Sequence, residues 1–424
     1  MIKTFYYGRD PDEAVFGREQ PLSRDVSDTV REIITDVARR GDDALRDYTE
    51  KFDGVRLSDI EVSREEMSEA LGKVDSGLLG VFHRAAENIT RFHSEQVRKG
   101  FELKDGGITL GQKVTPLARV GLYVPGGTAA YPSTVLMNVI PAKIAGCGEI
   151  IITTPPGRDG KVNPNVLAAA AVAGADRIFK AGGAQAIAAL AYGTETVPAV
   201  DKITGPGNAY VAEAKRQVFG MVSIDMIAGP SEILVIADGE NDPKVIAADL
   251  LSQAEHDKNA MSVLVTDSEE LAALVTCEIE DELSRLSREE IARASIDKNG
   301  RIIIVKDMAE AVKVSDRIAP EHLELCVADP FGLLGSVGNA GSVFLGRYCP
   351  EALGDYMAGP NHTLPTSGTA RFSSPLSVDD FVKKTQYCYF DRDSFLGIGD
   401  DVRRFAECEG LTAHAESAKA RMKK

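Results

Sequence analysis

Hydrophobic positions divide the chain into a helical N-terminal part and a long central part in which short strands alternate with helices. Between residues 23 and 53, valine and isoleucine recur at three- and four-residue spacing, which predicts an amphipathic helix that Gly41 can end. From about residue 120, β-branched runs are separated by alanine-rich runs that favour helix. The expected strands are 120–124, 149–153, 177–180, 202–204, 232–237, 262–266, 301–305 and 342–345.

Apolar strands that alternate with helices indicate parallel sheets that are buried on both faces. We therefore expect an α/β fold with two Rossmann-like parallel-sheet domains, each an incomplete nucleotide-binding fold, plus an N-terminal helical arm and a helical C-terminal tail domain. The expected parts are an arm over 1–22, one α/β domain built from 23–122 and 231–376, a second over 123–230, and a tail over 377–424.

Composition narrows the class of protein. Hydrophobic residues make up 44% and charged residues 26% of the chain, as in ordinary globular proteins. The net charge of −16 argues against broad contact with nucleic acid or an anionic membrane. No apolar run reaches the ~18 residues of a membrane span, and the first residues lack the apolar core of a secretion signal. The six cysteines are scattered without a CxxC pair, which indicates reduced thiols in a cytoplasmic protein.

Four segments carry glycine and proline near expected strand ends: 124–132, 180–190, 204–211 and 227–235. In open α/β sheets, ligands bind outside the carboxyl ends of the strands, where glycine lets the backbone approach them closely. Taken alone, each segment is more simply explained as an ordinary turn between a strand and a helix. None matches GxGxxG, so the spacing does not by itself predict a bound dinucleotide.

The segment 249–257 is the first candidate for metal chemistry. Gln253 and His256 are three residues apart, so on a helix they would share one face and could bind one metal ion. Asp249 and Glu255 offer further oxygens nearby. The alternative is a solvated polar helix face.

The segment 319–325 is the candidate for acid–base chemistry. Glu321 and His322 place a carboxylate beside an imidazole, two groups whose pKa values can be tuned in opposite directions. Pro320 suggests that a helix starts here. The alternative is a helix N-terminus whose dipole favours Glu321, which leaves His322 unexplained.

Two further segments carry ligand-type residues. The segment 352–374 has few helix or strand signals, so we expect an ordered loop that holds Asp355 and His362. Glu409 and His414 flank a short turn in the helical tail. Imidazole, amide and carboxylate groups without clustered cysteine suit a catalytic metal site better than a closed structural one. From residue types alone, a metal site and an unrelated set of polar side chains remain equally open.

Nearly the whole chain resembles the histidinol dehydrogenases, apart from the first residues and the last few. The resemblance rests on many long motifs that occur in the same order: ARRGDDALRDYTEKFDG, GLYVPGG, GGAQAIAALAYGTE, GPGNAYV, AGPSEILVIAD, DLLSQAEHD, APEHLEL, GSVFLG, GDYMAGPNHTLPTSGTARFSS and EGLTAH.

The resemblance implies a zinc- and NAD-dependent oxidation of L-histidinol to L-histidine through L-histidinal, with one Zn2+ ion per subunit. His322 would accept the alcohol proton, and Glu321 would activate the water that attacks the aldehyde. The implied zinc ligands are Gln253, His256, Asp355 and His414. The implied substrate contacts are these four residues together with His322, Ser231, His362 and Glu409. The implied NAD contacts are Tyr123, Gln185 and Asn208.

The resemblance also implies a homodimer in which the tail residues Glu409 and His414 complete the partner's site. Three other readings are weighed against this one. A related zinc and NAD alcohol dehydrogenase could act on another small polar alcohol. A metallohydrolase could use Glu321 to activate water without a nucleotide, and a binding protein could lack catalysis.

Overall fold

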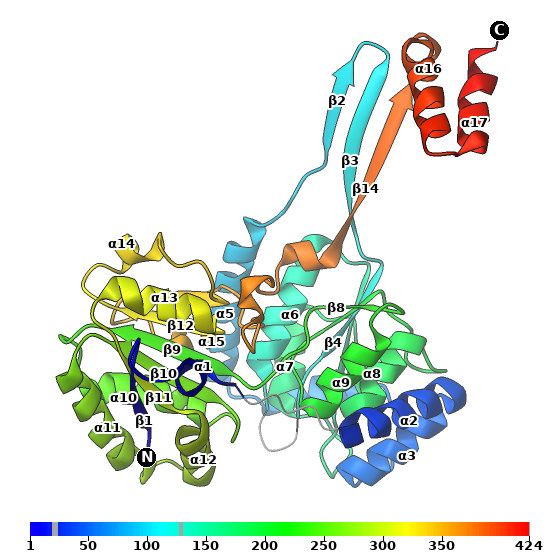
Figure 1. The fold of residues 1–424 in the computed structure, drawn as a ribbon. Helices are drawn as coiled ribbons and strands as arrows, with labels where there is room; N and C mark the ends of the chain where they lie inside the picture. Colours follow the sequence, from blue (N-terminus) through cyan, green and yellow to red (C-terminus); the bar gives the residue numbers. More distant parts are fainter. Residues whose placement is uncertain (19–23, 127–129, 424) are drawn as a thin grey trace. The chain divides into compact units, whose positions relative to one another are not determined.

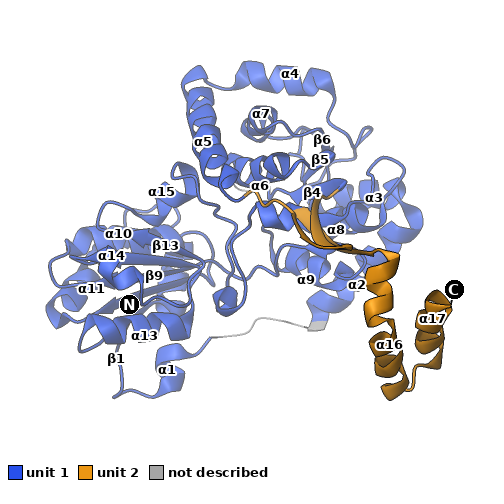
Figure 2. Ribbon diagram, turned by 90° about the horizontal axis from the view of Figure 1, so that it is seen from above, with its two compact units in different colours: residues 1–96, 118–381 blue, residues 97–117, 382–424 orange. Residues whose placement is uncertain are grey.

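The computed structural model describes residues 1–18, 24–126 and 130–423 (Figure 1). The chain divides into two compact units, which Figure 2 shows in blue and orange. The first comprises residues 1–96 and 118–381, and the second comprises residues 97–117 and 382–424. Among the described residues, no helix combines the length and apolar character that crossing a membrane requires.

The first unit contains a parallel sheet of six strands in the order β1-β11-β10-β9-β12-β13. Its strands are β1 (Lys3–Tyr6), β9 (Glu232–Ala237), β10 (Met261–Thr266), β11 (Arg301–Ile304), β12 (His322–Cys326) and β13 (Ser342–Leu345). Helices α10 (Pro243–Ala254), α11 (Glu269–Leu283) and α12 (Glu289–Asn299) share a core with one face. Helices α1 (Asp12–Phe16) and α13 (Met308–Ile318) share a core with the other face, where α14 (Pro330–Leu334) also contributes. Both faces are therefore buried, as continuous apolar strands require.

A second parallel sheet in the same unit has five strands in the order β6-β5-β4-β7-β8. They are β4 (Arg119–Tyr123), β5 (Glu149–Thr154), β6 (Arg177–Lys180), β7 (Lys202–Thr204) and β8 (Ser223–Ile224). The helices that connect them are α6 (Pro132–Ala145), α7 (Pro164–Ala173), α8 (Gly183–Tyr192) and α9 (Ala209–Val218). The expected α/β fold with two parallel sheets is confirmed.

The N-terminal helices pack on the helices of this second sheet. Helix α2 (Arg24–Arg40) contacts α8 and α9, and α3 (Asp42–Asp53) contacts α8. Helix α4 (Arg64–Lys73) packs on α7, and α5 (Ser76–Ser94) packs on α6 and α7. The apolar face that the sequence predicts for α2 thus packs on helices of the five-stranded sheet, where Val30 and Val37 are fully buried.

Gly41 separates α2 from α3, as the sequence predicts. Its φ of 57° lies in the left-handed region that favours glycine, and a Cβ there would collide with the carboxylate of Glu195. The same carboxylate accepts a hydrogen bond of 2.8 Å from the backbone N–H of Asp42. Glu195 can therefore approach this closely only because Gly41 has no side chain.

The second unit is an antiparallel sheet of three strands with two helices. The strands, in the order β14-β3-β2, are β2 (Phe101–Asp105), β3 (Ile108–Pro116) and β14 (Val382–Phe390). The helices are α16 (Arg392–Cys408) and α17 (Thr412–Met422), which pack on each other. The expected helical tail is correct for α16 and α17. The sequence pattern missed these three strands because none has a buried apolar face: β2 and β14 are almost wholly exposed, and β3 is mostly half-buried.

Every strand expected from the sequence is present, but two expectations around the candidate site are wrong. No helix begins at Pro320: α13 ends at Ile318, Ala319 adopts a left-handed φ of 50°, and the chain enters strand β12 at His322. A proline just after a left-handed residue stops a helix, since it cannot continue it. The segment 352–374 is also not wholly irregular, because α15 (Glu351–Tyr356) places Asp355 on a helix.

Candidate active site

The acid–base candidates gather at the amino ends of two neighbouring strands. Glu321 directly precedes β12, which begins at His322, and Ser231 directly precedes β9. The two strands pair in parallel with His322 beside Ile233, so these side chains come from one edge of the six-stranded sheet. Helix α10 follows β9 and ends at Ala254, so Gln253 and His256 lie in and just after its last turn.

His322 has a defined tautomer. Its Nδ1 lies 3.0 Å from the backbone carbonyl oxygen of Glu232, and because a carbonyl oxygen only accepts, Nδ1 carries the proton and donates it. Nε2 therefore holds the lone pair. It is buried, and it has no hydrogen-bond partner among the described residues. Burial lowers the pKa of His322 to about 4, so the ring is neutral and Nε2 is a free proton acceptor.

Glu321 is held by the same backbone residue. Its Oε2 accepts a hydrogen bond of 2.9 Å from the N–H of Glu232 and lies 3.7 Å from Nδ1 of His322. Burial raises the pKa of Glu321 well above its usual value, and the carboxylates of Glu232 and Asp355 add to this. The N–H and C=O of Glu232 thus fix the side chains of Glu321 and His322 relative to each other.

Helix α15 brings two carboxylates to this group. Glu351 and Asp355 are four residues apart and therefore share one face of the helix. One ligand atom from each of these two and one from His322 lie within 4.8 Å of one another, close enough to hold a metal ion. The sequence analysis missed Glu351; the available signal was its four-residue spacing from Asp355, hidden in a segment interpreted as a loop.

Gln253 lies directly against Glu351. The side chain is fully buried, and one terminal amide atom lies 2.6 and 2.9 Å from the two carboxylate oxygens of Glu351. That atom is the nitrogen, since an amide oxygen there would face both carboxylate oxygens of Glu351; it also lies 3.3 Å from Nδ1 of His322. The amide nitrogen therefore donates to Glu351, and the amide oxygen is turned away from this carboxylate.

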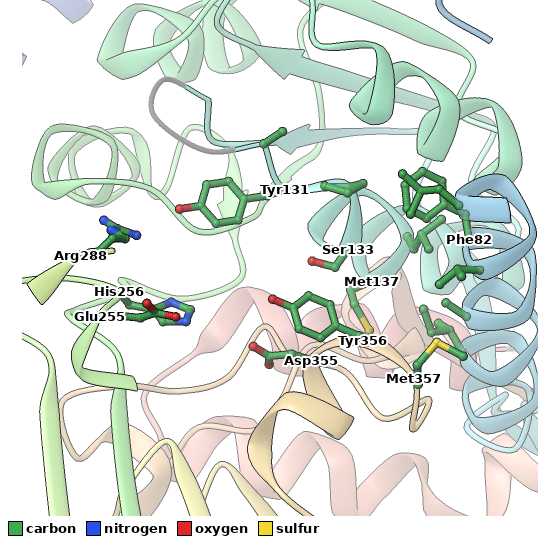
Figure 3. A pocket seen from close by; sticks show the side chains of 17 residues that line it. Phe82, Tyr131, Ser133, Met137, Glu255, His256, Arg288, Asp355, Tyr356 and Met357 are labelled. Atoms are coloured by element: carbon green, nitrogen blue, oxygen red, sulfur yellow. The ribbon is translucent and has the colours of Figure 1, made fainter. Parts of the chain in front are cut away.

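His256 and Asp355 line a pocket of about 440 Å³ (Figure 3). Glu255 and His256 lie at one end, Phe82 of α5 lies at the other, and Asp355 lies between them near Tyr356. Arg288 also lines it. The third histidine, His362, has its Nδ1 3.8 Å from Oδ1 of Asp355, and burial lowers its pKa. Gln253, His256, Asp355, His322 and His362 thus come together within one unit.

Glu409 and His414 belong to the second unit. Both side chains are exposed, Glu409 at the end of α16 and His414 in the first turn of α17. His414 lines a shallow hollow between these two helices together with Phe395 and Arg421.

The three candidate NAD contacts follow strands of the five-stranded sheet. The hydroxyl of Tyr123, at the end of β4, accepts a hydrogen bond of 3.1 Å from the N–H of Gly183 at the start of α8. Burial raises the pKa of Tyr123 to about 12. Gln185 on α8 is buried, and its Oε1 has no partner among the described residues. Asn208 caps α9 by accepting from the N–H groups of Tyr210 and Val211. Residues 127–129 of the first glycine-rich turn lie outside the described residues.

Asp53, whose charge acts on Tyr123, is a further residue that the sequence analysis did not single out. Asp53 ends α3, and the Oδ2 of its carboxyl is buried without a partner among the described residues. Burial raises the pKa of Asp53 to about 6, and its charge affects Tyr123. An acid at the end of an amphipathic helix gives no sequence signal that separates it from a solvated one.

The fold is α/β, and this group brings together buried carboxyl and imidazole side chains, three of which could hold a metal ion. A family profile described as histidinol dehydrogenase matches residues 17–422. The chain is 55% identical over 407 residues to a histidinol dehydrogenase of Clostridium acetobutylicum, covering 96% of this chain and 94% of that protein. It is 56% identical over 394 residues to one of Bacillus subtilis, covering 93% and 92%. A crystal structure of histidinol dehydrogenase from Elizabethkingia anophelis superimposes with a TM-score of 0.94 at 38% identity, over 99% of this chain and 98% of that one.

The chain therefore belongs to the histidinol dehydrogenase family.

Proposed function

We propose that the protein oxidises L-histidinol to L-histidine through L-histidinal, with NAD as the oxidant in both steps and one zinc ion per subunit. Membership of the histidinol dehydrogenase family supports the substrate and the reaction class. One structural observation carries the mechanism: the imidazole of His322 lies beside Gln253, Asp355 and Glu351, and its buried Nε2 has no partner among the described residues.

The residues fit a zinc ion. The proposed ligands Gln253, His256 and Asp355, completed by His414 of the partner's tail, supply the nitrogen and oxygen donors that catalytic zinc sites use. Neither Glu321 nor Glu351 pairs with a lysine or arginine within the described parts of the chain, so this buried acidic group lacks positive charge. When bound, zinc would orient the amino alcohol and NAD would accept a hydride in each oxidation.

His322 is the base for the first oxidation. Its Nε2 takes the proton of the alcohol, while Nδ1 stays hydrogen-bonded to the carbonyl oxygen of Glu232. Glu321 serves the second oxidation, in which it removes a proton from the water that attacks the aldehyde. Its burial supports this role, because a poorly solvated carboxylate binds a proton strongly.

Ser231, His362 and Glu409 are proposed substrate contacts, and Tyr123, Gln185 and Asn208 are proposed NAD contacts. For Gln185 the support is its buried, unpartnered Oε1. Tyr123 and Asn208 already make hydrogen bonds that hold α8 and α9, so their contact with NAD would add to a structural role. Glu409 and His414 lie exposed on a separate unit, which suits a tail that completes the site of a second subunit.

The test is the absorbance of reduced nicotinamide after NAD and L-histidinol are added, before and after a chelator removes the metal. We expect two NADH per histidinol, loss of turnover on chelation, and recovery with zinc. Full activity of metal-free protein would reject the zinc site. Faster turnover of other small polar alcohols would favour the related alcohol dehydrogenase, and hydrolysis without nucleotide would favour the metallohydrolase.

A further inference from the structure

We propose that Glu351 is a positioning residue that fixes the side-chain amide of Gln253 with its oxygen free for the metal ion. This inference rests on the zinc site of the proposed function. It adds a residue that is neither a proposed ligand nor a proposed acid–base group.

The contact between the two side chains is the first observation. The amide nitrogen of Gln253 lies 2.6 and 2.9 Å from the two oxygens of Glu351, and both side chains are buried. A glutamine amide can rotate by half a turn and exchange its nitrogen and oxygen at little cost. A carboxylate accepts hydrogen bonds only, so it selects the orientation in which the nitrogen faces it. The oxygen, which is the atom that a metal ion binds, then points elsewhere.

Glu351 is itself anchored to the strand that carries His322. Its backbone N–H donates a hydrogen bond of 2.7 Å to Oε1 of Glu324, two residues after His322 on β12. Glu324 is buried in its turn. A continuous path therefore runs from β12 through Glu324 and α15 to Gln253 on α10. Outer partners of this kind orient metal ligands, and their loss typically weakens metal binding by roughly 10–100-fold.

The competing reading is that Glu351 binds the metal directly with His322 and Asp355, whose ligand atoms lie within 4.8 Å. Two contacts argue against it. Both oxygens of Glu351 are within hydrogen-bond distance of the Gln253 amide nitrogen. The ring nitrogen of His322 that lies 3.7 Å from Glu351 is Nδ1, which carries a proton and donates it to Glu232. As the donor to Glu232, Nδ1 has no lone pair for a metal ion, and the amide nitrogen of Gln253 also lies 3.3 Å from it. Nε2 is then the ring atom of His322 that could join such a site.

The experiment measures the zinc affinity of the full-length dimer by competition with a chromophoric chelator. We expect Glu351→Leu to weaken zinc binding by roughly 10–100-fold. Glu351→Gln should weaken it less, since its side-chain oxygen can still accept from Gln253. Ser252→Ala is the matched control, because it alters a half-buried polar side chain next to Gln253 on the same helix, and that hydroxyl donates to the backbone carbonyl of Asp249; it should change zinc affinity least. Circular dichroism of the metal-free proteins checks that each variant folds.

A double-mutant cycle separates positioning from ligation. If Glu351 acts through Gln253, Glu351→Leu should cost little further zinc affinity in a Gln253→Ala background. The visible spectrum of the cobalt-substituted Glu351→Leu protein should then resemble that of Gln253→Ala. Additive losses would overturn the inference and make Glu351 an independent ligand. If Gln253→Ala weakens zinc binding and Glu351→Leu does not, the inference fails while the proposed zinc site stands. If the wild-type protein binds no zinc, both fail.

Discussion

The backbone carbonyl oxygen of Glu232 lies 3.0 Å from Nδ1 of His322 and decides which ring nitrogen of that imidazole is free. The N–H of Glu232 meanwhile holds the carboxyl of Glu321. The two proposed proton acceptors are thus both hydrogen-bonded to the backbone of Glu232, the first residue of β9. Five predictions follow from this arrangement and its surroundings.

His322→Asn should lower kcat by roughly 10²–10⁴-fold, the usual contribution of a general base. Zinc content should stay near one ion per subunit, because His322 is not a proposed ligand. Steady-state kinetics and metal analysis of the same preparation check both points. Loss of zinc in parallel with activity would instead make His322 a ligand.

Glu321→Gln should impair the oxidation of L-histidinal more than that of L-histidinol. The amide cannot take a proton from water, whereas the first oxidation relies on His322. The two half-reactions are measured separately by supplying either the alcohol or the aldehyde with NAD. Equal losses in both would reject the water-activating role.

Mixing Asp355→Ala chains with His414→Ala chains should restore activity if the tails are exchanged between subunits. Each mixed dimer would then have one intact site and one site that carries both changes. After random re-association, about a quarter of the wild-type activity is expected, since half the dimers are mixed. Native mass spectrometry confirms the subunit exchange. Mixed dimers without activity would argue that each site uses residues of a single chain.

The free energy of unfolding of Asp53→Asn, relative to that of the wild type, should increase as pH rises. Burial raises the pKa of Asp53 to about 6, above the ordinary value of 3.8 for an aspartate side chain. The folded protein therefore binds this proton more tightly than the unfolded chain, and the wild type loses stability between about pH 4 and 6. Urea midpoints at pH 4.5 and 7.5 test this, with the exposed Asp59→Asn as control. A stability difference that does not change with pH would contradict it.

Tyr123→Phe should lower the free energy of unfolding by about 1 kcal/mol, because the first N–H of α8 loses its acceptor. If Tyr123 also contacts NAD, the KM for NAD should rise as well. The exposed Tyr210→Phe on α9 is the control. A change in stability with an unaltered KM would leave Tyr123 a purely structural role.

The sequence predicted the two parallel sheets because their strands are buried on both faces and stand out as apolar runs. It missed β12, because the segment HLELC contains two polar residues and follows Pro320, which indicated the start of a helix. In the structure these polar residues are buried beside α15: Glu324 accepts from the backbone of Glu351, and His322 bonds to Glu232. Such contacts between distant segments leave no periodic signal in the sequence.

The rule that ligands bind at the carboxyl ends of strands agrees with the positions of two proposed NAD contacts but not with that of the proposed acid–base pair. It suits Tyr123 and Gln185, which follow strands of the five-stranded sheet. The proposed acid–base pair Glu321 and His322 lies instead at the amino end of β12, beside the amino end of β9. Gln253 reaches this edge because α10 runs back along the sheet, a consequence of topology that spacing in the sequence does not reveal.

Glu321 and His322 are held by the main-chain N–H and C=O of Glu232. These contacts therefore tolerate mutation of residue 232 better than a contact between two side chains would. Exchanging the side chain at position 232 leaves both the amide hydrogen and the carbonyl oxygen in place; only proline would delete the hydrogen. Mutation can therefore remove the charge at position 232 and its ion pair with Arg18. The relative positions of Glu321 and His322 would be preserved as long as strand β9 forms.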